Sequence, residues 1–513
     1  MEATVWSLLP PLVMIVLVLL TRKVLLSLGA GIIVGALMVE SFNIIGTAER
    51  IWNTFQHLFY MEGDWDIWSL QLVAFLLLLG ILIAFLTATG GAGAFGNWAV
   101  GRIKTRKGSQ YTTGLLGLGI FIDDYFNSLT IGQVSRPVTD RQNVSRAKLA
   151  YLIDSTSAPV TVLTPISSWG AYIIGIIASI IATHELANMG ALEAFIQMIP
   201  YNFYAIAAIL LVFLVIYFKL DFGPMKKHEK RAQETGELID PNNTDVPGDL
   251  KGGVIENTGG KVYHLLIPIL VLLITTVTSM IVTGVQASEG EATLVSIFAN
   301  TDVNLSLVLG GTISVVVAML FYSVQQGEKT NFFLVTWEGI KAMLPAVYIL
   351  VLAWMIVSII EAIGTDQYLV GLVEGADLNA AYLPLIIFLV AGIMAFATGT
   401  SWGTFGLMLP IAGSMAVALD PGLLIPALAA VLAGSVFGDH CSPISDTSVL
   451  SSTGAGSNHL DHVITQIPYA VMAALSATLG YLALALTSSV FVGLILTIIV
   501  LVGLVLLLKQ ILK

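Results

Sequence analysis

The sequence has few charged residues and a single cysteine. Asp, Glu, Lys and Arg make up 11% of its 513 residues, whereas a soluble protein carries roughly a quarter. Hydrophobic residues make up 56%, and the mean hydropathy is +0.89, which is more apolar surface than a water-soluble fold can bury. The lone Cys441 excludes a framework of intrachain disulfides. We therefore expect an all-α polytopic membrane protein.

Apolar segments long enough to cross a bilayer recur along the whole chain. The start lacks positive residues and the basic pair Arg22 and Lys23 follows the first apolar run, so we expect a retained first span with its N-terminus outside, not a cleavable signal peptide. Eleven spans are predicted, at about 5–20, 24–40, 66–89, 147–183, 200–218, 262–284, 304–323, 342–362, 423–450, 466–487 and 489–509.

Two more hydrophobic stretches, about 110–137 and 380–418, are interrupted by small and polar residues, and we interpret them as re-entrant hairpins. The positive charges support this layout. Of the 22 Lys and Arg residues, only Arg50 falls outside, and none is placed deep in a span. The expected location is a bacterial inner membrane, with the C-terminus in the cytoplasm. The net charge of −11 gives no reason to expect a nucleic-acid partner.

The two halves of the chain repeat the same order of segments. The run that begins at Val5 resembles the run at Val262, and that at Leu25 resembles that at Leu305. We predict two units, 1–219 and 262–487, each with five spans and one hairpin, joined by a flexible cytoplasmic linker at 220–261 and followed by an extra span in 488–513. Five spans is an odd number, so the second unit is inverted. Chance similarity between apolar segments is the alternative.

Acidic and hydroxyl-bearing residues interrupt the first half twice. Intramembrane carboxylates are costly and usually functional, and hard cations prefer oxygen ligands. In the hairpin at 110–137, Thr130 follows a run of acidic, amide and hydroxyl-bearing residues. In the span at 147–183, Pro159 and Pro165 are expected to break the helix. The candidate ligands of Na⁺ or H⁺ are Asp123, Asp124, Asn127, Ser128, Asp154, Thr156 and Ser157. A polar cytoplasmic loop and back-bonded hydroxyls are the alternatives.

The second half carries a related but different set. Its hairpin has hydroxyls and glycines without a carboxylate, and its broken span at 423–450 places acids on both sides of Pro443. The candidates for a second site or a substrate site are Thr400, Ser401, Trp402, Asp439, His440, Ser442 and Asp446. His440 could titrate near neutral pH, although a lone histidine is more often structural. Close packing of small residues is the alternative for the hairpin.

The candidate residues expected inside the membrane include several carboxylates, all of which are negative when ionised. Carboxylates and hydroxyls without a buried Lys or Arg attract Na⁺ or H⁺, and competition of the two ions for the same oxygens is a minimal antiport mechanism. An anionic organic substrate stays open, because half-helix N-termini bind carboxylates without arginine.

With these motifs the chain resembles the NhaC family of Na⁺/H⁺ antiporters, in the ion-transporter superfamily. The resemblance is carried by IDDYFNSLTIGQVSRPVTDRQNVSRAKLAYLIDSTSAPV and FGDHCSPISDTSVLSSTGAGSNHLDHV, and the order of spans covers nearly the whole chain. It implies a scaffold and a transport subdomain, often a homodimer, and Na⁺ and H⁺ coupling around Asp124, Asn127, Asp154 and Asp439. Na⁺ is then a coupling ion, bound at Asp124, Asn127 and Asp154, and no cofactor is expected.

The resemblance does not fix the cargo. Some relatives exchange malate and lactate, and others move amino acids, so a Na⁺- or H⁺-coupled organic transporter is the alternative. The two SWG motifs, which include Ser168, Trp169, Ser401 and Trp402, fit such an organic site or a helix-packing corner. An intramembrane aspartyl protease and a channel are less favoured, and we expect no enzyme, because an acid dyad needs no inverted hairpins.

Overall fold

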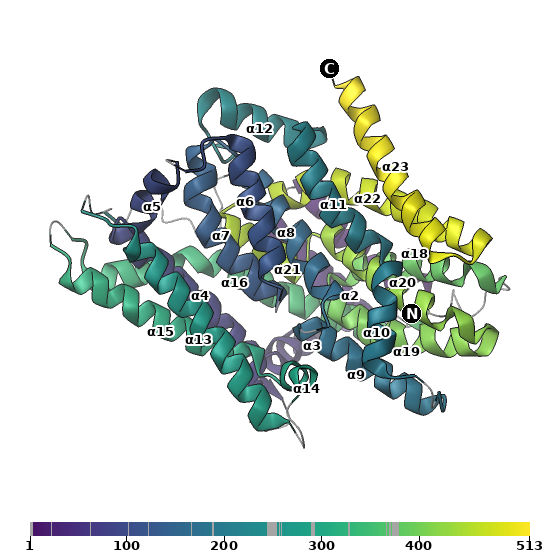
Figure 1. The fold of residues 1–513 in the computed structure, drawn as a ribbon. Coiled ribbons are helices and arrows are strands. Elements are labelled where there is room, and N and C mark those ends of the chain that lie inside the picture. The colour runs from purple at the N-terminus through teal and green to yellow at the C-terminus, as the bar shows by residue number, and fades with distance from the viewer. Residues whose placement is uncertain are drawn as a thin grey trace.

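A computed structural model describes the chain in residues 4–21, 23–61, 63–100, 102–121, 123–165, 167–186, 189–243, 254–255, 257, 259–288, 293–326, 329–365, 367–368, 371 and 379–512. The described residues are overwhelmingly helical, with one two-residue antiparallel strand pair, β1 (Tyr60–Met61) and β2 (Asp64–Trp65). Figure 1 shows long helices arranged side by side, as the apolar composition predicts.

The helices of the first half, with two short 3-10 turns, are η1 (Val5–Leu8), α1 (Leu9–Thr21), α2 (Val24–Val39), α3 (Ile44–His57), α4 (Ile67–Ala88), α5 (Gly91–Val100), α6 (Arg106–Gly119), α7 (Asp124–Arg141), α8 (Arg146–Leu163), α9 (Ser168–Thr183), α10 (Ala191–Met198), η2 (Ile199–Tyr201), α11 (Phe203–Phe218) and α12 (Gly223–Thr235).

Those of the second half are α13 (Tyr263–Ala287), α14 (Leu294–Ala299), α15 (Val303–Val324), α16 (Phe332–Ala362), η3 (Ala380–Tyr382), α18 (Leu383–Thr398), α19 (Ser401–Leu419), η4 (Pro421–Leu423), α20 (Leu424–Cys441), α21 (Asp446–Ala455), α22 (His459–Thr487) and α23 (Val490–Ile511).

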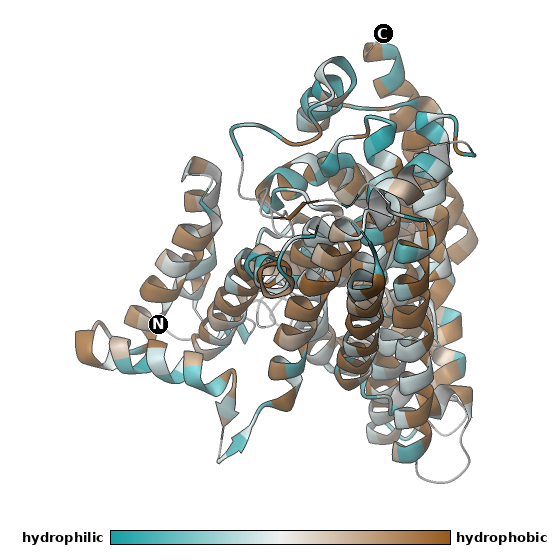
Figure 2. Cartoon of the chain, turned by 90° about the vertical axis from the view of Figure 1, so that its left-hand side faces the viewer, coloured by the Kyte–Doolittle hydropathy of each residue, from teal (hydrophilic) through white to brown (hydrophobic). Residues whose placement is uncertain are grey.

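The polytopic all-α prediction is confirmed. Within the described residues, nine helices are long and apolar enough to cross a membrane, or eleven if two bent helix pairs each count as one span. Figure 2 shows hydrophobic residues along these long helices and hydrophilic ones at many of their ends. This distribution is the one that a hydrocarbon solvent demands of a helical protein.

Both predicted broken spans are interrupted at a proline, but Pro159, which was also expected to break the first span, lies inside α8. The span at 147–183 consists of α8 and α9, bent by 41° around the break that contains Pro165. Within the span at 423–450, α20 ends at Cys441 and α21 begins at Asp446, with Pro443 between them. Proline removes a backbone donor and clashes with the preceding turn, so the helix cannot continue through these positions.

The two predicted hairpins differ from each other. The first corresponds to α6 and α7, which are separated by 120–123, and the second to α18 and α19, which are separated by Gly399 and Thr400. Both helices of the second hairpin are long and apolar enough to span a membrane. Helix α7 is rich in polar residues, and it is buried against α5, α6, α8 and α21 instead of facing lipid.

Two large hydrophobic cores flank the polar segments. One is built from α4, α13, α15 and α16, and the other from α8, α9, α11, α18, α19, α20, α22 and α23. In Figure 1 α4, α13 and α15 lie at the left, α18, α19, α20 and α23 lie at the right, and α8 and α21 lie between them. The breaks in the helices are therefore held between two rigid apolar bodies.

The prediction of a flexible linker at 220–261 is wrong for its first part. There α12 packs against α8 and α22, and the Glu229 side chain is buried, forms an ion pair with Arg106 and accepts a hydrogen bond from the Ser145 backbone N–H (2.8 Å). The inward positions Met225, Glu229 and Ala232 follow a helical spacing that the polar composition concealed. Residues 244–253 lie outside the described residues.

The sequence also missed a buried lysine. Lys148 lies in the first turn of α8 with its side chain 1% exposed, and it forms an ion pair with Asp221 (2.8 Å) just before α12. Paired burial near a helix end avoids the cost of an isolated charge. The segment from Asp221 to α12 thus holds the beginning of α8 in place.

Candidate functional site

A cavity of about 940 Å³ lies where α4, α7, α16 and the helix breaks meet. Six carboxylates line it, and among its described lining residues there is no Lys or Arg. The carboxylates are Asp66, Asp123, Asp124, Asp302, Glu361 and Asp446. A low-dielectric cleft lined by charges of one sign concentrates counter-ions, so this cavity attracts cations.

Asp123 and Asp124 stand at the beginning of α7. Asp123 caps the helix: one carboxylate oxygen accepts the Phe126 backbone N–H (2.9 Å), as Asp commonly does at an N-cap, and the other accepts the Ser168 hydroxyl (2.8 Å). Asp124 is the first residue of α7 and is 1% exposed, yet its Oδ2 has no hydrogen-bond partner among the described residues. Of the two neighbours, both of which line the cavity, Asp124 thus has a buried carboxylate oxygen without a partner in the described part of the chain.

Asn127 lies one turn further along α7. Its amide nitrogen donates to the carbonyl oxygens of Gly117 (2.8 Å) and Ile120 (2.5 Å), where α6 ends. The last carbonyls of a helix have no partner within the helix, so a side-chain amide is a suitable donor for them. This leaves the Asn127 Oδ1 buried and without a partner in the described part of the chain. Two predicted ligands, Asp124 and Asn127, therefore offer unpaired oxygens at i and i+3.

Asp446 joins the cavity from the second half of the chain. It begins α21, and its carboxylate accepts hydrogen bonds from the Tyr125 hydroxyl and from the Thr447 backbone N–H (2.8 Å). The structure thus brings together the hairpin of the first half and the broken span of the second half. Tyr125 was not among the predicted site residues.

The two SWG motifs fold in the same way. Ser168 and Ser401 each begin a helix after a break, and the hydroxyl of the preceding residue accepts the backbone N–H of the motif's glycine. Ser168 donates to Asp123 (2.8 Å) and Ser401 to Asp439 (2.9 Å), so both predicted substrate serines contact carboxylates. Trp169 is fully buried, with its ring centroid 6.2 Å from that of Trp402, and Trp402 lines the cavity.

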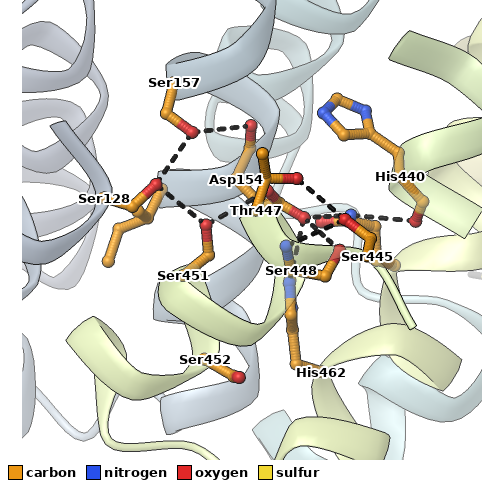
Figure 3. Close-up of polar contacts among 12 residues, drawn as sticks. Ser128, Asp154, Ser157, His440, Ser445, Thr447, Ser448, Ser451, Ser452 and His462 are labelled. Carbon is orange, nitrogen blue, oxygen red and sulfur yellow. Dashed lines mark hydrogen bonds and ion pairs between the residues drawn. The ribbon is translucent and has the colours of Figure 1, made fainter. Parts of the chain in front are cut away.

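Asp154 forms a separate polar cluster, drawn in Figure 3. Four side chains from α21 and α22 contact its carboxylate: Ser451 at Oδ1 (3.1 Å), and Ser448 (3.0 Å), His462 (3.1 Å) and Gln466 (2.6 Å) at Oδ2. Ser128 links this cluster to α7, because its hydroxyl lies 3.1 Å from those of both Ser157 and Ser451. Asp154 does not line the cavity.

Other predicted site residues contribute less to the cavity or to the cluster around Asp154. The Thr156 hydroxyl donates to backbone carbonyls of its own helix, and Ser157 does so to the Asp154 carbonyl (3.4 Å). The His440 ring contacts the Tyr204 hydroxyl (2.9 Å) and not the carboxylate of its sequence neighbour, Asp439. The Ser442 hydroxyl accepts the Ile444 backbone N–H (3.4 Å). Asp439 also accepts from Thr447 (3.1 Å), which links it to α21.

The sequence prediction missed His462 and Gln466. With His459 they follow the spacing i, i+3, i+7, which places all three on one face of α22. This pattern could have indicated a polar face buried inside the protein. In the described ranges, no three His, Cys, Asp or Glu side chains converge as ligands of one metal ion, so a Na⁺ site here has to include hydroxyl, amide or backbone oxygens.

Comparisons with known proteins agree with this picture. A family model described as Na⁺/H⁺ antiporter family matches residues 160–486. An uncharacterized protein of Haemophilus influenzae is 45% identical, over 96% of this chain and 93% of that relative. The malate-2H⁺/Na⁺-lactate antiporter of Bacillus subtilis is 39% identical over 19% of this chain and 22% of its own, and an uncharacterized Na⁺/H⁺ antiporter of Haemophilus influenzae is 32% identical over 25% and 26%. The chain belongs to the Na⁺/H⁺ antiporter family and is a secondary transporter.

Proposed function

We propose that this protein exchanges Na⁺ for H⁺ across the bacterial inner membrane, with Asp124 as the central cation ligand. The observation that carries the proposal is the buried Oδ2 of Asp124, which has no hydrogen-bond partner among the described residues and lies in the wall of an acidic cavity. A buried carboxylate oxygen without a partner is costly, and either a cation or a proton removes that cost. Because one oxygen serves both ions, binding of one excludes the other.

The second ligand in this proposal is Asn127, whose Oδ1 is also buried and unpaired within the described residues. Its amide nitrogen is held by two carbonyls of α6, which fixes the direction of the oxygen. Cavity water and backbone oxygens at the helix break complete the coordination of Na⁺ in this scheme. Asp154 was predicted as a third ligand. Its four side-chain contacts favour a different role, that of joining α8 to α21 and α22.

The proposed architecture includes two inverted repeats. In support, the order of helices in the first unit (α1, α2, α4, a hairpin, α8 with α9, then α11) is the same as in the second (α13, α15, α16, a hairpin, α20 with α21, then α22). With the N-terminus outside, we place the opening of the larger cavity on the outer side, because residues 300–303 of an expected outer loop line it. A homodimer is also part of the proposal, and its support is the family resemblance.

An organic acid as cargo has less support. A hydroxy-acid anion would meet six carboxylates in the larger cavity and no Lys or Arg among its described lining residues. Like charges repel strongly where water is scarce. The relative named for malate and lactate resembles this chain over 19% of its length.

The test is Na⁺-driven proton movement in liposomes that contain the purified protein. We expect an imposed Na⁺ gradient to change the internal pH, and Asp124→Asn to lower this rate at least about a hundredfold, because the variant loses the charge that binds the cation. Asp420→Asn is the matched control, since Asp420 is an exposed cap of η4 outside the cavity. A wild-type protein without Na⁺-dependent proton movement would overturn the function, and an active Asp124→Asn variant would overturn the site.

A further inference from the structure

Helix α7 carries a row of buried polar side chains at every third position. They are Asp124, Asn127, Thr130 and Gln133, with exposed fractions of 1%, 0%, 1% and 6%. Each has a polar atom without a hydrogen-bond partner among the described residues: Oδ2, Oδ1, Oγ1 and Nε2, respectively. Side chains three apart are neighbours on a helix surface, so the four form a row that winds around α7 and places Gln133 about half a turn away from Asp124. Most buried polar groups are paired, and four unpaired ones in succession require an explanation.

The row connects two cavities. Asp124 lines the cavity of about 940 Å³, and Gln133 lines a second cavity of about 420 Å³, which is bordered by α4, α5, α7 and α13. Nine residues separate them, which is about 13 Å along a helix. Asn127 and Thr130 lie between the two ends and line neither cavity.

The side of α7 that faces α21 is closed. The Ser128 and Ser451 hydroxyls meet there at 3.1 Å, and a Cβ added to Gly132 would lie 2.3 Å from the carbonyl carbon of Gly454. Two backbones this close leave no space for an ion. Asn127 points instead toward the end of α6, where its amide nitrogen donates to the carbonyls of Gly117 and Ile120. A route past α7 therefore has to follow the row and not the α21 side.

The smaller cavity has more positive than negative side chains among its lining residues. Arg136, Arg141 and Arg146 line it together with Asp140. Arg146 forms an ion pair with Asp140 (2.7 Å) and donates to the Ala455 carbonyl (2.8 Å), which ties this end of the route to the last turn of α21. The positive charges oppose a cation at this end, whereas carboxylates attract it at the other.

We propose that the row forms the route of the transported cation between the two cavities, with Thr130 and Gln133 as its ligands beyond Asp124 and Asn127. This inference rests on the proposed Na⁺/H⁺ exchange and adds the direction in which the ion leaves Asp124. A Na⁺ ion that gives up water needs oxygen ligands at each step, and hydroxyl and amide groups supply them without a trapping charge. The Gln133 amide offers its oxygen by rotating about its last bond.

The test separates binding from transport. In Thr130→Val, which removes the hydroxyl at nearly constant volume, we expect the maximal rate of Na⁺-dependent proton movement to fall about tenfold. Na⁺ affinity, measured as the rise of the unfolding temperature with Na⁺ concentration, should stay within about twofold of wild type, because Asp124 is unchanged. Thr130→Ser should restore the rate. The control is Thr139→Val, a buried threonine of the same helix whose hydroxyl donates to its own backbone.

A second variant, Gln133→Leu, tests the other end of the row and replaces the first if Thr130→Val does not fold. The same tenfold loss of rate with unchanged Na⁺ affinity is expected. Wild-type rates in both Thr130→Val and Gln133→Leu would overturn the route while leaving the proposed function intact. A wild-type protein without Na⁺-dependent proton movement would overturn both. Loss of Na⁺ affinity in Thr130→Val would also count against the route, since it would make Thr130 part of the Asp124 site.

Discussion

Asp124 and Asp154 are both buried aspartates on adjacent helices, and they meet the cost of burial in opposite ways. Asp154 contacts four side chains, and both of its oxygens are occupied. Asp124 keeps an oxygen without a partner among the described residues, at the wall of a cavity. A buried polar group with hydrogen-bond partners contributes rigidity, whereas one without partners is a place where a ligand can bind. We propose from this contrast that Asp154 stabilises the fold and that Asp124 exchanges the ions.

The partners of Asp154 come from the second half of the chain, which explains what it stabilises. Helix α8 carries Asp154, and α21 and α22 carry the four contacting side chains. Both broken spans therefore meet at this carboxylate, which is not among the residues that line the larger cavity.

The largest effect on stability is expected from Asp154→Asn. The new amide nitrogen would face hydroxyl and amide donors that now contact the carboxylate, and leaving such buried groups unpaired costs about 2–4 kcal/mol of unfolding free energy. Thermal unfolding of the purified protein in detergent should show a lower midpoint. Asp124→Asn should leave the midpoint equal or higher, because it removes a buried charge that has no partner.

Equal midpoints for Asp154→Asn and Asp124→Asn would break the comparison. So would an Asp154→Asn protein that is as stable as the wild type and has lost Na⁺ affinity alone, because that result would make Asp154 the cation ligand that the sequence motif suggested. Measuring the Na⁺ dependence of the midpoint in both variants distinguishes these cases.

A smaller effect is expected from Gln466→Leu. This change removes the shortest contact of Asp154 (2.6 Å) and the donor to the His440 carbonyl (3.0 Å). Loss of one buried partner costs about 1–3 kcal/mol, less than loss of the acceptor that all four side chains share. The unfolding midpoint should fall between those of wild type and Asp154→Asn, with Na⁺ affinity retained. A midpoint below that of Asp154→Asn would contradict the view that the carboxylate is the centre of the cluster.

The sequence predicted the membrane class, several helix breaks and three of the six cavity carboxylates, because each has a local cause. Hydropathy indicates the spans, Pro165 and Pro443 mark two of the breaks, and an acid in an apolar run is conspicuous by its cost. These signals located Asp123, Asp124, Asp154, Asp439 and Asp446.

The sequence could not predict which carboxylate has hydrogen-bond partners for both oxygens, because those partners are distant in the chain. Asp154 contacts His462 and Gln466 about 300 positions later, and Tyr125 reaches Asp446 across a similar separation. The linker helix α12 was missed for a related reason: its buried Glu229 pairs with Arg106, and composition alone shows only a charged segment. Long-range pairing is a property of the packed fold and has no signal in a single sequence.

The smallest effects on stability are expected from substitutions of the two SWG serines. Ser168→Ala and Ser401→Ala each remove one hydrogen bond to a buried carboxylate, of Asp123 (2.8 Å) and Asp439 (2.9 Å), so each should lower the unfolding free energy by about 1 kcal/mol. Their effects on Na⁺ should differ. Asp123 lines the larger cavity beside Asp124 and Asp439 does not, so only Ser168→Ala should change the apparent affinity for Na⁺, by about threefold. Equal changes in affinity in the two variants would place Asp439 in the cation site and extend that site beyond the cavity.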